Sequence, residues 1–284
     1  MSEIKEVRAV RDLTIVVNSC DAYEDVLALF FAALQDQWPD CPYPVIINTE
    51  TKKYEHYPAT VNNSGLKEAD KWGERLRSTL QSTSSEFVLM LCDDFILETA
   101  INVEGLEAAL DLLQRDETSA VVYLINTSLP VVEPGISDMF LEVRDGSDYR
   151  LNSAPGIWRK RDLLNYTEPN DNPWAWEVFG SYRTYRDGKS FYTLNPKFTD
   201  IYPYDYRKGG AIYRGKWVRS VVLEKFDRYD LCVDPLLRGY SEEGAYEPRG
   251  FLWKFNFMVA GYRMVGLKSL LFVYRYMRAK INGK

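Results

Sequence analysis

The sequence predicts an α/β fold built on a doubly wound, mostly parallel sheet and followed by a basic amphipathic helical tail. Three short apolar runs rich in β-forming residues, at 13–18, 44–48 and 87–91, are typical of strands buried on both faces of a parallel sheet. Segments with the helical spacing of apolar residues separate these runs. The first strand, helix and second strand therefore make a βαβ unit, whose crossover is expected to be right-handed.

The remaining elements follow from local signals. Asp21 is the expected N-cap of a helix over residues 23–38. Asn172 followed by Pro173 predicts the start of a helix over residues 174–185. Further helices are expected at 66–80, 104–114 and 217–230, and further strands at 120–125, 140–143, 149–152 and 191–194.

This order of elements predicts one domain with two halves and a tail. The chain has 284 residues, enough for a full hydrophobic core. Residues 1–125 alternate strand and helix and form the expected nucleotide-binding half, while residues 126–245 form the expected acceptor half. Residues 246–284 are the expected tail.

Composition excludes several classes of protein. The chain is 46% hydrophobic and 27% charged, as soluble globular proteins are. Its one histidine, His56, excludes a His-rich zinc site and disfavours a Ser–His hydrolase, so acid–base chemistry falls to carboxylates. The four cysteines form no CxxC pair, which favours reduced thiols in a cytosolic protein.

The two ends of the chain differ in character. The first 12 residues are charged and lack an apolar signal core, and no uninterrupted apolar run approaches the ~20 residues that span a bilayer, so we expect neither export nor a spanning helix. Residues 251–284 hold seven basic residues and no acidic one, which leaves 28 basic and 41 acidic residues, or −13, in the rest. Such a tail can lie in the headgroup region of an anionic membrane, or it can pack on the domain with its basic edge in water. The number of basic residues favours the membrane.

Asp93 and Asp94 directly follow the strand at 87–91. Ligands of open α/β sheets bind beyond the carboxyl ends of the strands, which is where both carboxylates would lie. Two such close charges repel unless a cation or hydrogen-bond donors compensate them. The pair therefore indicates a site for Mg²⁺ or Mn²⁺ shared with nucleotide phosphates; the alternative is that one Asp caps the next element and the other is solvated.

Four motifs carry a resemblance: Ser19-Cys20-Asp21, Lys71-Trp72-Gly73-Glu74-Arg75-Leu76, Cys92-Asp93-Asp94-Phe95 and Trp174-x-Trp176-Glu177. Together they resemble bacterial nucleotide-sugar-dependent glycosyltransferases of the GT-A fold, particularly those that build capsule, O-antigen and related polysaccharides. The resemblance covers residues 13–217 and implies a GT-A-like domain with a UDP- or GDP-type sugar donor bound beyond the first three strands.

The resemblance also assigns donor residues. Base and ribose would be held by Asp21, Arg75 and the run Asn48-Thr49-Glu50. Asp93 and Asp94 match the Asp-x-Asp position for metal and diphosphate, but Cys92 and Phe95 flank them, so only two carboxylates are available. Lys208 or Arg214 from later loops could then share the phosphate charge.

The acceptor side centres on Glu177. The resemblance makes it the base that takes the acceptor hydroxyl's proton in an inverting transfer; the alternative is a surface carboxylate supporting its own helix. Trp174 and Trp176 offer faces for sugar rings, and Trp158 lies near the acceptor-side loop, although plain core packing explains Trp158 equally well.

These expectations describe a cytoplasmic glycosyltransferase of hexosyltransferase type, peripheral at the inner face of the plasma membrane, with a glycan or polyprenyl-linked acceptor and no nucleic-acid partner. A non-catalytic glycan- or nucleotide-binding module is the alternative from another class. A sugar-phosphate nucleotidyltransferase is a weaker one, because that class needs a Gly-rich loop after the first strand and this chain has no glycine before Gly65.

Overall fold

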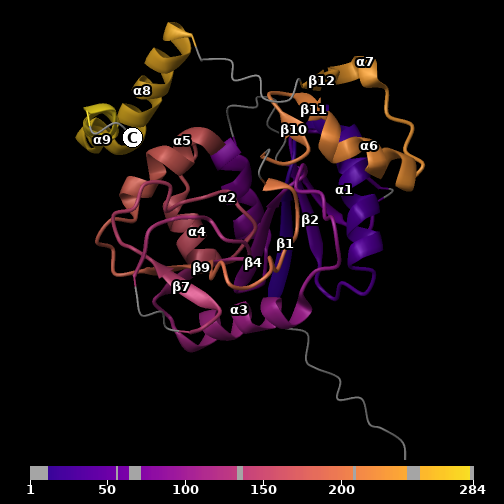
Figure 1. Ribbon diagram of the computed structural model, residues 1–284, viewed down its shortest axis with the longest axis horizontal. Helices are drawn as coiled ribbons and strands as arrows, with labels where there is room; N and C mark the ends of the chain where they lie inside the picture. The colour runs from indigo at the N-terminus through magenta and orange to yellow at the C-terminus, as the bar shows by residue number, and fades with distance from the viewer. Residues whose placement is uncertain are drawn as a thin grey trace, which may run out of the picture.

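In the computed structural model, which describes residues 12–55, 57–63, 72–132, 137–206, 209–241 and 250–281, a nine-stranded sheet forms the centre of the molecule (Figure 1). Its strand order is β3-β2-β1-β4-β8-β5-β9-β7-β6. Four parallel strands make the first half: β1 (Leu13–Asn18), β2 (Val45–Thr49), β3 (Thr60–Asn63) and β4 (Phe87–Cys92). The α/β fold with a mostly parallel sheet is therefore confirmed.

The second half of the sheet mixes directions. Strand β8 (Gly156–Arg159) lies antiparallel between β4 and β5 (Ser119–Tyr123). Beyond β5 follow β9 (Ser190–Leu194), β7 (Phe140–Val143) and β6 (Val131–Val132).

The strand expected at 149–152 is wrong. A turn with Gly146 at φ +76 follows β7, but Tyr149 has φ +56 and leaves the extended conformation. Strand β7 pairs with β9 and β6 instead.

Helices cover both faces of the sheet. The first half carries η1 (Asp21–Tyr23), α1 (Glu24–Gln37), α2 (Trp72–Ser82) and α3 (Val103–Arg115). The chain after residue 125 carries α4 (Lys160–Tyr166), α5 (Pro173–Val178), η3 (Gly180–Arg183), α6 (Arg219–Arg228) and α7 (Pro235–Arg238), of which α6 and α7 lie beside α1 (Figure 1). A small sheet of β10 (Ile212–Tyr213), β11 (Lys216–Val218) and β12 (Tyr240–Ser241) lies over the carboxyl ends of β1 and β2 (Figure 1).

Two predicted helix starts have different outcomes. Asn172 caps α5 as expected, because its Oδ1 accepts a hydrogen bond of 2.9 Å from the Ala175 N–H. That helix is shorter than predicted: it ends at Val178, and η3 begins two residues later. Asp21 does not cap α1: it begins η1, and Tyr23 stands at the N-cap without a side-chain bond.

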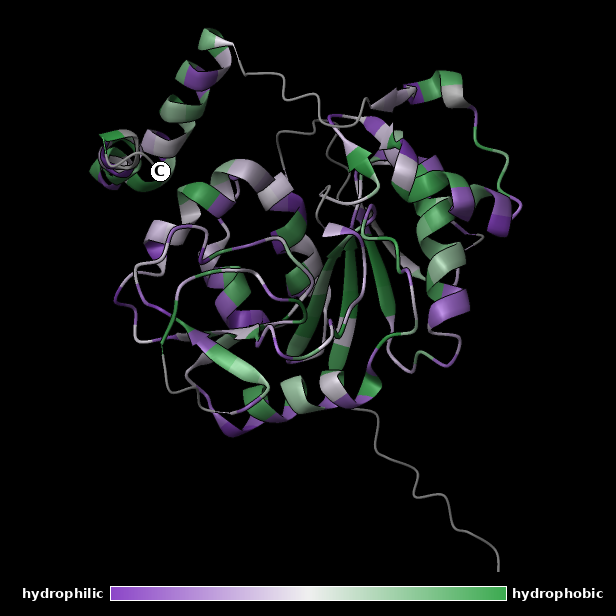
Figure 2. Cartoon of the chain, in the orientation of Figure 1, coloured by the Kyte–Doolittle hydropathy of each residue, from purple (hydrophilic) through white to green (hydrophobic). Residues whose placement is uncertain are grey.

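The core is formed by the central strands and the helix faces against them. All six residues of β1 and five of the six in β4 are buried, which agrees with the apolar runs in the sequence. Figure 2 shows these strands as hydrophobic ribbons behind helices of mixed character. The four cysteines are free thiols.

The tail folds as α8 (Phe251–Val265), η5 (Gly266–Ser269) and α9 (Leu270–Ile281), and packs beside α5 (Figure 1). The stretch from Phe251 to Arg278 is long and apolar enough to cross a membrane. This differs from the expectation that the chain has no spanning helix. However, Gly266 has φ +58 and ends α8, so the stretch is two helices of 15 and 12 residues. At about 1.5 Å per residue each is shorter than the ~30 Å core of a bilayer.

Candidate functional site

The carboxyl ends of β1, β2 and β4 are joined by polar side chains. Asn48 donates a hydrogen bond of 2.9 Å from Nδ2 to Asn18 Oδ1, and Asn18 donates one of 3.1 Å to the Leu91 carbonyl. Asn48 and Thr49 are fully buried. These two predicted donor residues therefore lie beneath the surface, where they set the register of the strand ends.

Asp21 holds the loop after β2. Its carboxylate accepts hydrogen bonds from the Thr49 hydroxyl at 2.9 Å and from the backbone N–H groups of Thr51 and Lys52 at 3.0 and 3.1 Å. Burial acts to raise the pKa of Asp21, but these bonds outweigh it and hold the pKa well below the ordinary value of 3.8. Asp21 is therefore an anion that holds the loop after β2 in place. We call the carboxyl ends of β1, β2 and β4, together with this loop, the donor edge, after the predicted donor site.

Glu50 and Arg75 form a buried ion pair next to this loop. Their exposed fractions are 6% and 3%, and Arg75 donates from Nη1 to the Glu50 carboxylate, which also accepts the Asp21 N–H. The Arg75 guanidinium is therefore compensated inside the protein. Arg75 retains one buried N–H, on Nε, that has no partner among the described residues.

Asp93 and Asp94 lie at the end of β4, as predicted. Asp93 is buried, with its N–H bonded to the Asn18 carbonyl and Oδ2 accepting from the Ser19 hydroxyl at 2.6 Å. Burial, and next the charge of Asp94, raise the pKa of Asp93 well above its ordinary value. Burial also raises the pKa of Asp94 to about 7, although two backbone N–H groups favour its charged form. The ionised pair is thus costly here without a cation.

Gly210, from the segment before β10, lies against Asp94. The Ala211 N–H donates to the Asp94 carbonyl at 2.9 Å, and Gly210 has φ +109. A Cβ atom on Gly210 would lie 2.8 Å from Asp94 Oδ2. Gly210 is therefore required both by its backbone conformation and by the close approach to the carboxylate.

Of the two predicted phosphate residues, Lys208 lies outside the described residues. Arg214 is exposed, has φ +51, and places its guanidinium 5.4 Å from the centre of the Tyr213 ring.

Arg238 is a site residue that the sequence did not indicate. It donates to the Asp25 carboxylate, at 2.7 Å from Nε, and to the Ala22 carbonyl at 2.8 Å. The guanidinium lies 4.7 Å from the Tyr23 ring centre, and its charge opposes the larger effect of burial, which raises the pKa of Asp93. Asp25 and Arg238 are 213 positions apart, and α7 carries no motif that would have indicated the contact.

Glu177 lies on α5. Oε1 accepts the Ser153 N–H at 2.7 Å and the Ser153 hydroxyl, and among the described residues Oε2 accepts no hydrogen bond. Burial raises the pKa of Glu177 above 4.5, against those two bonds. The charges of Glu177 and Asp94 both act to raise the pKa of Cys92 and of Tyr204, so the two carboxylates lie within electrostatic reach of the same two side chains.

The predicted acceptor tryptophans separate into two kinds. Trp158 and Trp176 are 0% exposed, and the Trp176 indole donates to the Tyr166 carbonyl at 3.1 Å. Neither presents a ring face to an acceptor, so their assignment as acceptor residues is corrected to core packing. Trp174 is 63% exposed and lines a cavity of about 580 Å³ together with Glu177.

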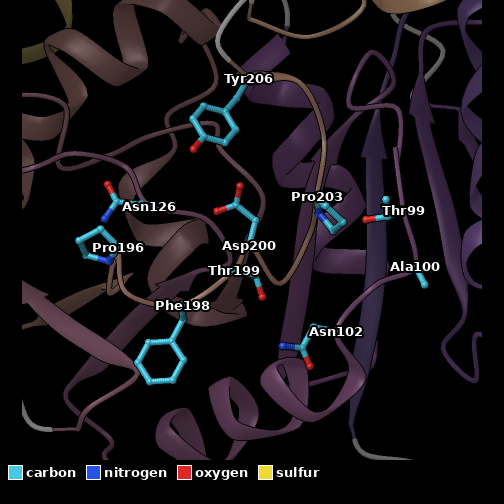
Figure 3. Close-up of a pocket in the computed structure, with 10 residues that line it drawn as sticks. All are labelled: Thr99, Ala100, Asn102, Asn126, Pro196, Phe198, Thr199, Asp200, Pro203 and Tyr206. Carbon is cyan, nitrogen blue, oxygen red and sulfur yellow. The ribbon is translucent and has the colours of Figure 1, made fainter.

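A larger cavity, of about 720 Å³, lies between segments 99–102 and 196–206 (Figure 3). Asn102, Asn126 and Asp200 line it, and none of the predicted site residues does. Two of these side chains have local partners: Asn102 caps α3, and Asn126 donates to the Leu194 carbonyl at 3.0 Å.

The donor edge can hold a metal only together with a ligand. The described residues contain no group of three or more His, Cys, Asp or Glu side chains placed to bind an ion. Asp93 and Asp94 provide oxygen ligands, and Mg²⁺ is often held by one or two carboxylates plus substrate phosphates. The two residues fit that mode of binding.

Comparisons with known proteins give similarities of fold. No family model and no curated protein matches the chain. Among solved structures, TarS of S. aureus is 16% identical over 66% of this chain and 35% of its own, at TM-score 0.42, and its 1–349 portion is 12% identical over 92% and 82%, at 0.48. The chain thus spans about a third of the full TarS chain.

Two other similar structures belong to different enzymes. Glucosyl-3-phosphoglycerate synthase from Mycobacterium tuberculosis, in complex with Mn²⁺ and UDP-glucose, is 16% identical over 40% of this chain and 43% of its own, at TM-score 0.29. A CMP-2-keto-3-deoxy-manno-octonic acid synthetase in complex with CTP is 15% identical over 65% and 89%, at 0.38. At these identities the likeness concerns the fold alone.

Proposed function

We propose that the protein is a glycosyltransferase that moves a sugar from a UDP- or GDP-type donor to a glycan or polyprenyl-linked acceptor, with inversion. One observation carries this proposal: Asp94 at the end of β4 and Glu177 on α5, from opposite halves of the chain, both lie close enough to Cys92 and Tyr204 for their charges to act on them. A donor diphosphate needs the carboxylates at the end of β4, and an acceptor hydroxyl needs Glu177.

On the donor side, Asp93 and Asp94 would hold Mg²⁺ or Mn²⁺, which would neutralise the charge that develops on the leaving diphosphate. Arg238 is the basic group that the structure adds, because its charge already acts on Asp93. Asp21 and the loop it holds would contact the base or ribose, since Asp21, Lys52 and Arg238 line one cavity of about 470 Å³.

On the acceptor side, Glu177 acts as the general base. Its Oε2 takes the proton of the acceptor hydroxyl while the hydroxyl oxygen forms the bond to the anomeric carbon and the bond to the diphosphate breaks on the opposite face. Ser153 orients the carboxylate through Oε1. Burial makes Glu177 a stronger base than an exposed carboxylate.

The cellular setting belongs to the same proposal. The acid-free basic tail and the exposed apolar side chains of α8 and α9 favour attachment at the inner face of the plasma membrane, in polysaccharide synthesis. The tail also packs on the domain, so the two alternatives stated for it are compatible: one face packs, and the other is available to a membrane.

The first test is a thermal-shift panel of UDP-, GDP-, CMP- and dTDP-sugars, each with Mn²⁺, Mg²⁺ or EDTA. A ligand that binds only the native state raises the melting temperature. We expect a shift with one nucleotide class that EDTA abolishes. A shift that survives EDTA would indicate that basic side chains such as Arg238, and not a metal ion, bind the phosphates. No shift with any nucleotide would contradict the proposal.

Turnover then separates the alternatives. Glu177→Gln should keep donor affinity and lose transfer, whereas a binding module has no transfer to lose. A nucleotidyltransferase would instead release pyrophosphate from a nucleoside triphosphate and a sugar phosphate. The segment that follows β1, in which Ser19 leads into η1, lacks the glycine-rich loop of that class.

A further inference from the structure

We infer that the cavity between α5 and the tail helices binds the apolar chain of a prenyl-phosphate-type acceptor and directs its sugar toward Glu177. This inference rests on the proposed function and names the acceptor class for the same site. The cavity, of about 580 Å³, is lined by Trp174 and Glu177 from one side and by Trp253, Lys254, Phe257 and Phe272 from the tail. We call it the tail groove.

The walls of the tail groove suit a hydrocarbon chain. Trp253 and Phe257 stack at 4.9 Å with an interplanar angle of 13°, and Phe272 and Tyr276 stack at 6.4 Å and 17°. Trp174 faces the groove and is 63% exposed. A sugar ring can stack on Trp174, but it also needs hydrogen-bonding groups around its hydroxyls, whereas an isoprenoid needs only the apolar contact that the stacked rings provide.

The two charged residues of the groove match the rest of such an acceptor. Lys254 can pair with a phosphate, and Glu177 can accept the proton of a sugar hydroxyl. A prenyl-linked acceptor consists of an apolar chain, a phosphate and then a sugar. The aromatic wall, the one cation and the one carboxylate of the groove match these three parts.

The groove is held in place by packing between the tail and the domain. Phe179, which follows α5, lies 4.9 Å from Phe257 and 5.5 Å from Phe272 by ring centres. A Cβ atom on Gly261 would lie 2.5 Å from the Phe179 ring, so α8 approaches as closely as a glycine allows. Arg275 anchors α9 through the Asp148 carboxylate and, at 3.1 Å, the Gly146 carbonyl.

The outer face of the tail gives the chain a place to continue. Large apolar side chains there are exposed, among them Phe251 at 85%, Leu267 at 74% and Ile281 at 81%, and the segment holds no acidic residue. Because α8 and α9 are each too short to cross a bilayer, such a face suits the plane of an anionic membrane. A prenyl chain could then run from the groove into the lipid.

The test uses the full chain and farnesyl phosphate, with binding followed by tryptophan fluorescence and by calorimetry. Trp174→Ala should weaken farnesyl phosphate binding about tenfold, because it removes an aromatic wall. Lys254→Gln should remove the preference for farnesyl phosphate over farnesol. The matched control is Leu267→Asp on the outer face, which should leave farnesyl phosphate binding unchanged.

A vesicle assay completes the pattern in the opposite sense. Leu267→Asp should lower binding to phosphatidylcholine vesicles that contain phosphatidylglycerol, while Trp174→Ala should not. Equal farnesyl phosphate affinity in wild type, Trp174→Ala and Lys254→Gln, or saturable binding of a soluble oligosaccharide that Trp174→Ala abolishes, would overturn the inference.

The same experiments distinguish this inference from the proposed function. Donor binding by thermal shift together with no farnesyl phosphate binding would refute the groove and leave a glycosyltransferase with a soluble acceptor. Farnesyl phosphate binding that depends on Trp174, together with no nucleotide shift, would confirm the groove as a lipid site and refute the transferase.

Discussion

The two sides of the proposed site, the donor side at the carboxyl ends of β1, β2 and β4 and the acceptor side at Glu177, are built by opposite means. On the donor side, polar side chains at the ends of β1, β2 and β4 hydrogen-bond to one another, and the Asp21 carboxylate is already saturated by its own loop. On the acceptor side, Ser153 is the one hydrogen-bond partner of the Glu177 carboxylate among the described residues, and the wall beyond it is aromatic. Under the proposed function, a network of hydrogen bonds would fix donor recognition, whereas acceptor recognition would depend on how the tail packs.

The largest expected effect breaks the acceptor side. Glu177→Gln should lower turnover about 10²–10⁴-fold, the range for a general base, with donor affinity unchanged. In wild type, the rate should fall as the pH is lowered, and because burial raises the pKa of Glu177, the fall should begin above 4.5. A pH–rate profile and donor calorimetry check both. Wild-type turnover in Glu177→Gln would remove Glu177 from the mechanism.

The second effect breaks the donor edge from inside. Arg75→Met leaves Glu50 charged and buried, which should cost about 3–5 kcal/mol of unfolding free energy. Urea unfolding measures it. The double variant Glu50→Gln with Arg75→Met should recover much of the loss, since it leaves no buried charge. An unaltered midpoint in Arg75→Met would show that the pair is solvated.

A glycine comparison sharpens the role of the loop over Asp94. Gly210→Ala and Gly209→Ala both place alanine at positive φ, at +109 and +82, which costs about 1–3 kcal/mol. Only at Gly210 would the Cβ meet Asp94 Oδ2, while at Gly209 it meets nothing within 4 Å. Gly210→Ala should therefore also weaken donor binding, and Gly209→Ala should not. Equal donor affinities would mean that the contact is not needed.

The smallest effect tests the charge at the donor edge. The native pKa of Asp94, about 7, exceeds the ordinary 3.8, so between these values the folded protein binds more protons than the unfolded chain. Asp94 therefore lowers stability as the pH rises through this window. In EDTA, Asp94→Asn should raise the melting temperature by a few degrees at pH 8 and have little effect at pH 4. A lower melting temperature at pH 8 would contradict this.

The sequence predicted the donor side better than the acceptor side because of where the residues lie along the chain. Asp93, Asp94 and Asn48 each end an apolar run, so their positions follow from strand periodicity. The local contacts of a residue on this side were harder to predict than its position. Asp21, for example, was expected to cap a helix, but it holds a neighbouring loop. Trp176 was misassigned because a Trp in a short motif has the same appearance whether it lines a site or the core, while for Trp158 the alternative of core packing holds.

The tail groove and Arg238 lay beyond sequence reasoning for a different reason. Both depend on contacts between residues that are far apart in the chain: Asp25 with Arg238, and Phe179 with Phe257. No local pattern encodes a contact of that separation, and the loops that bring these residues together carry no motif. Only the folded chain shows them.

The ion pair between Asp25 and Arg238 has a consequence for how the protein is made. The residues of α1 leave the ribosome long before residue 238, so the contact between α1 and Arg238 can form only late in synthesis. Fragments that end before α7 would keep the four parallel strands but lack this arginine. Fragments that end after β12 would retain it, and they are therefore the natural starting point for studying the donor side without the tail.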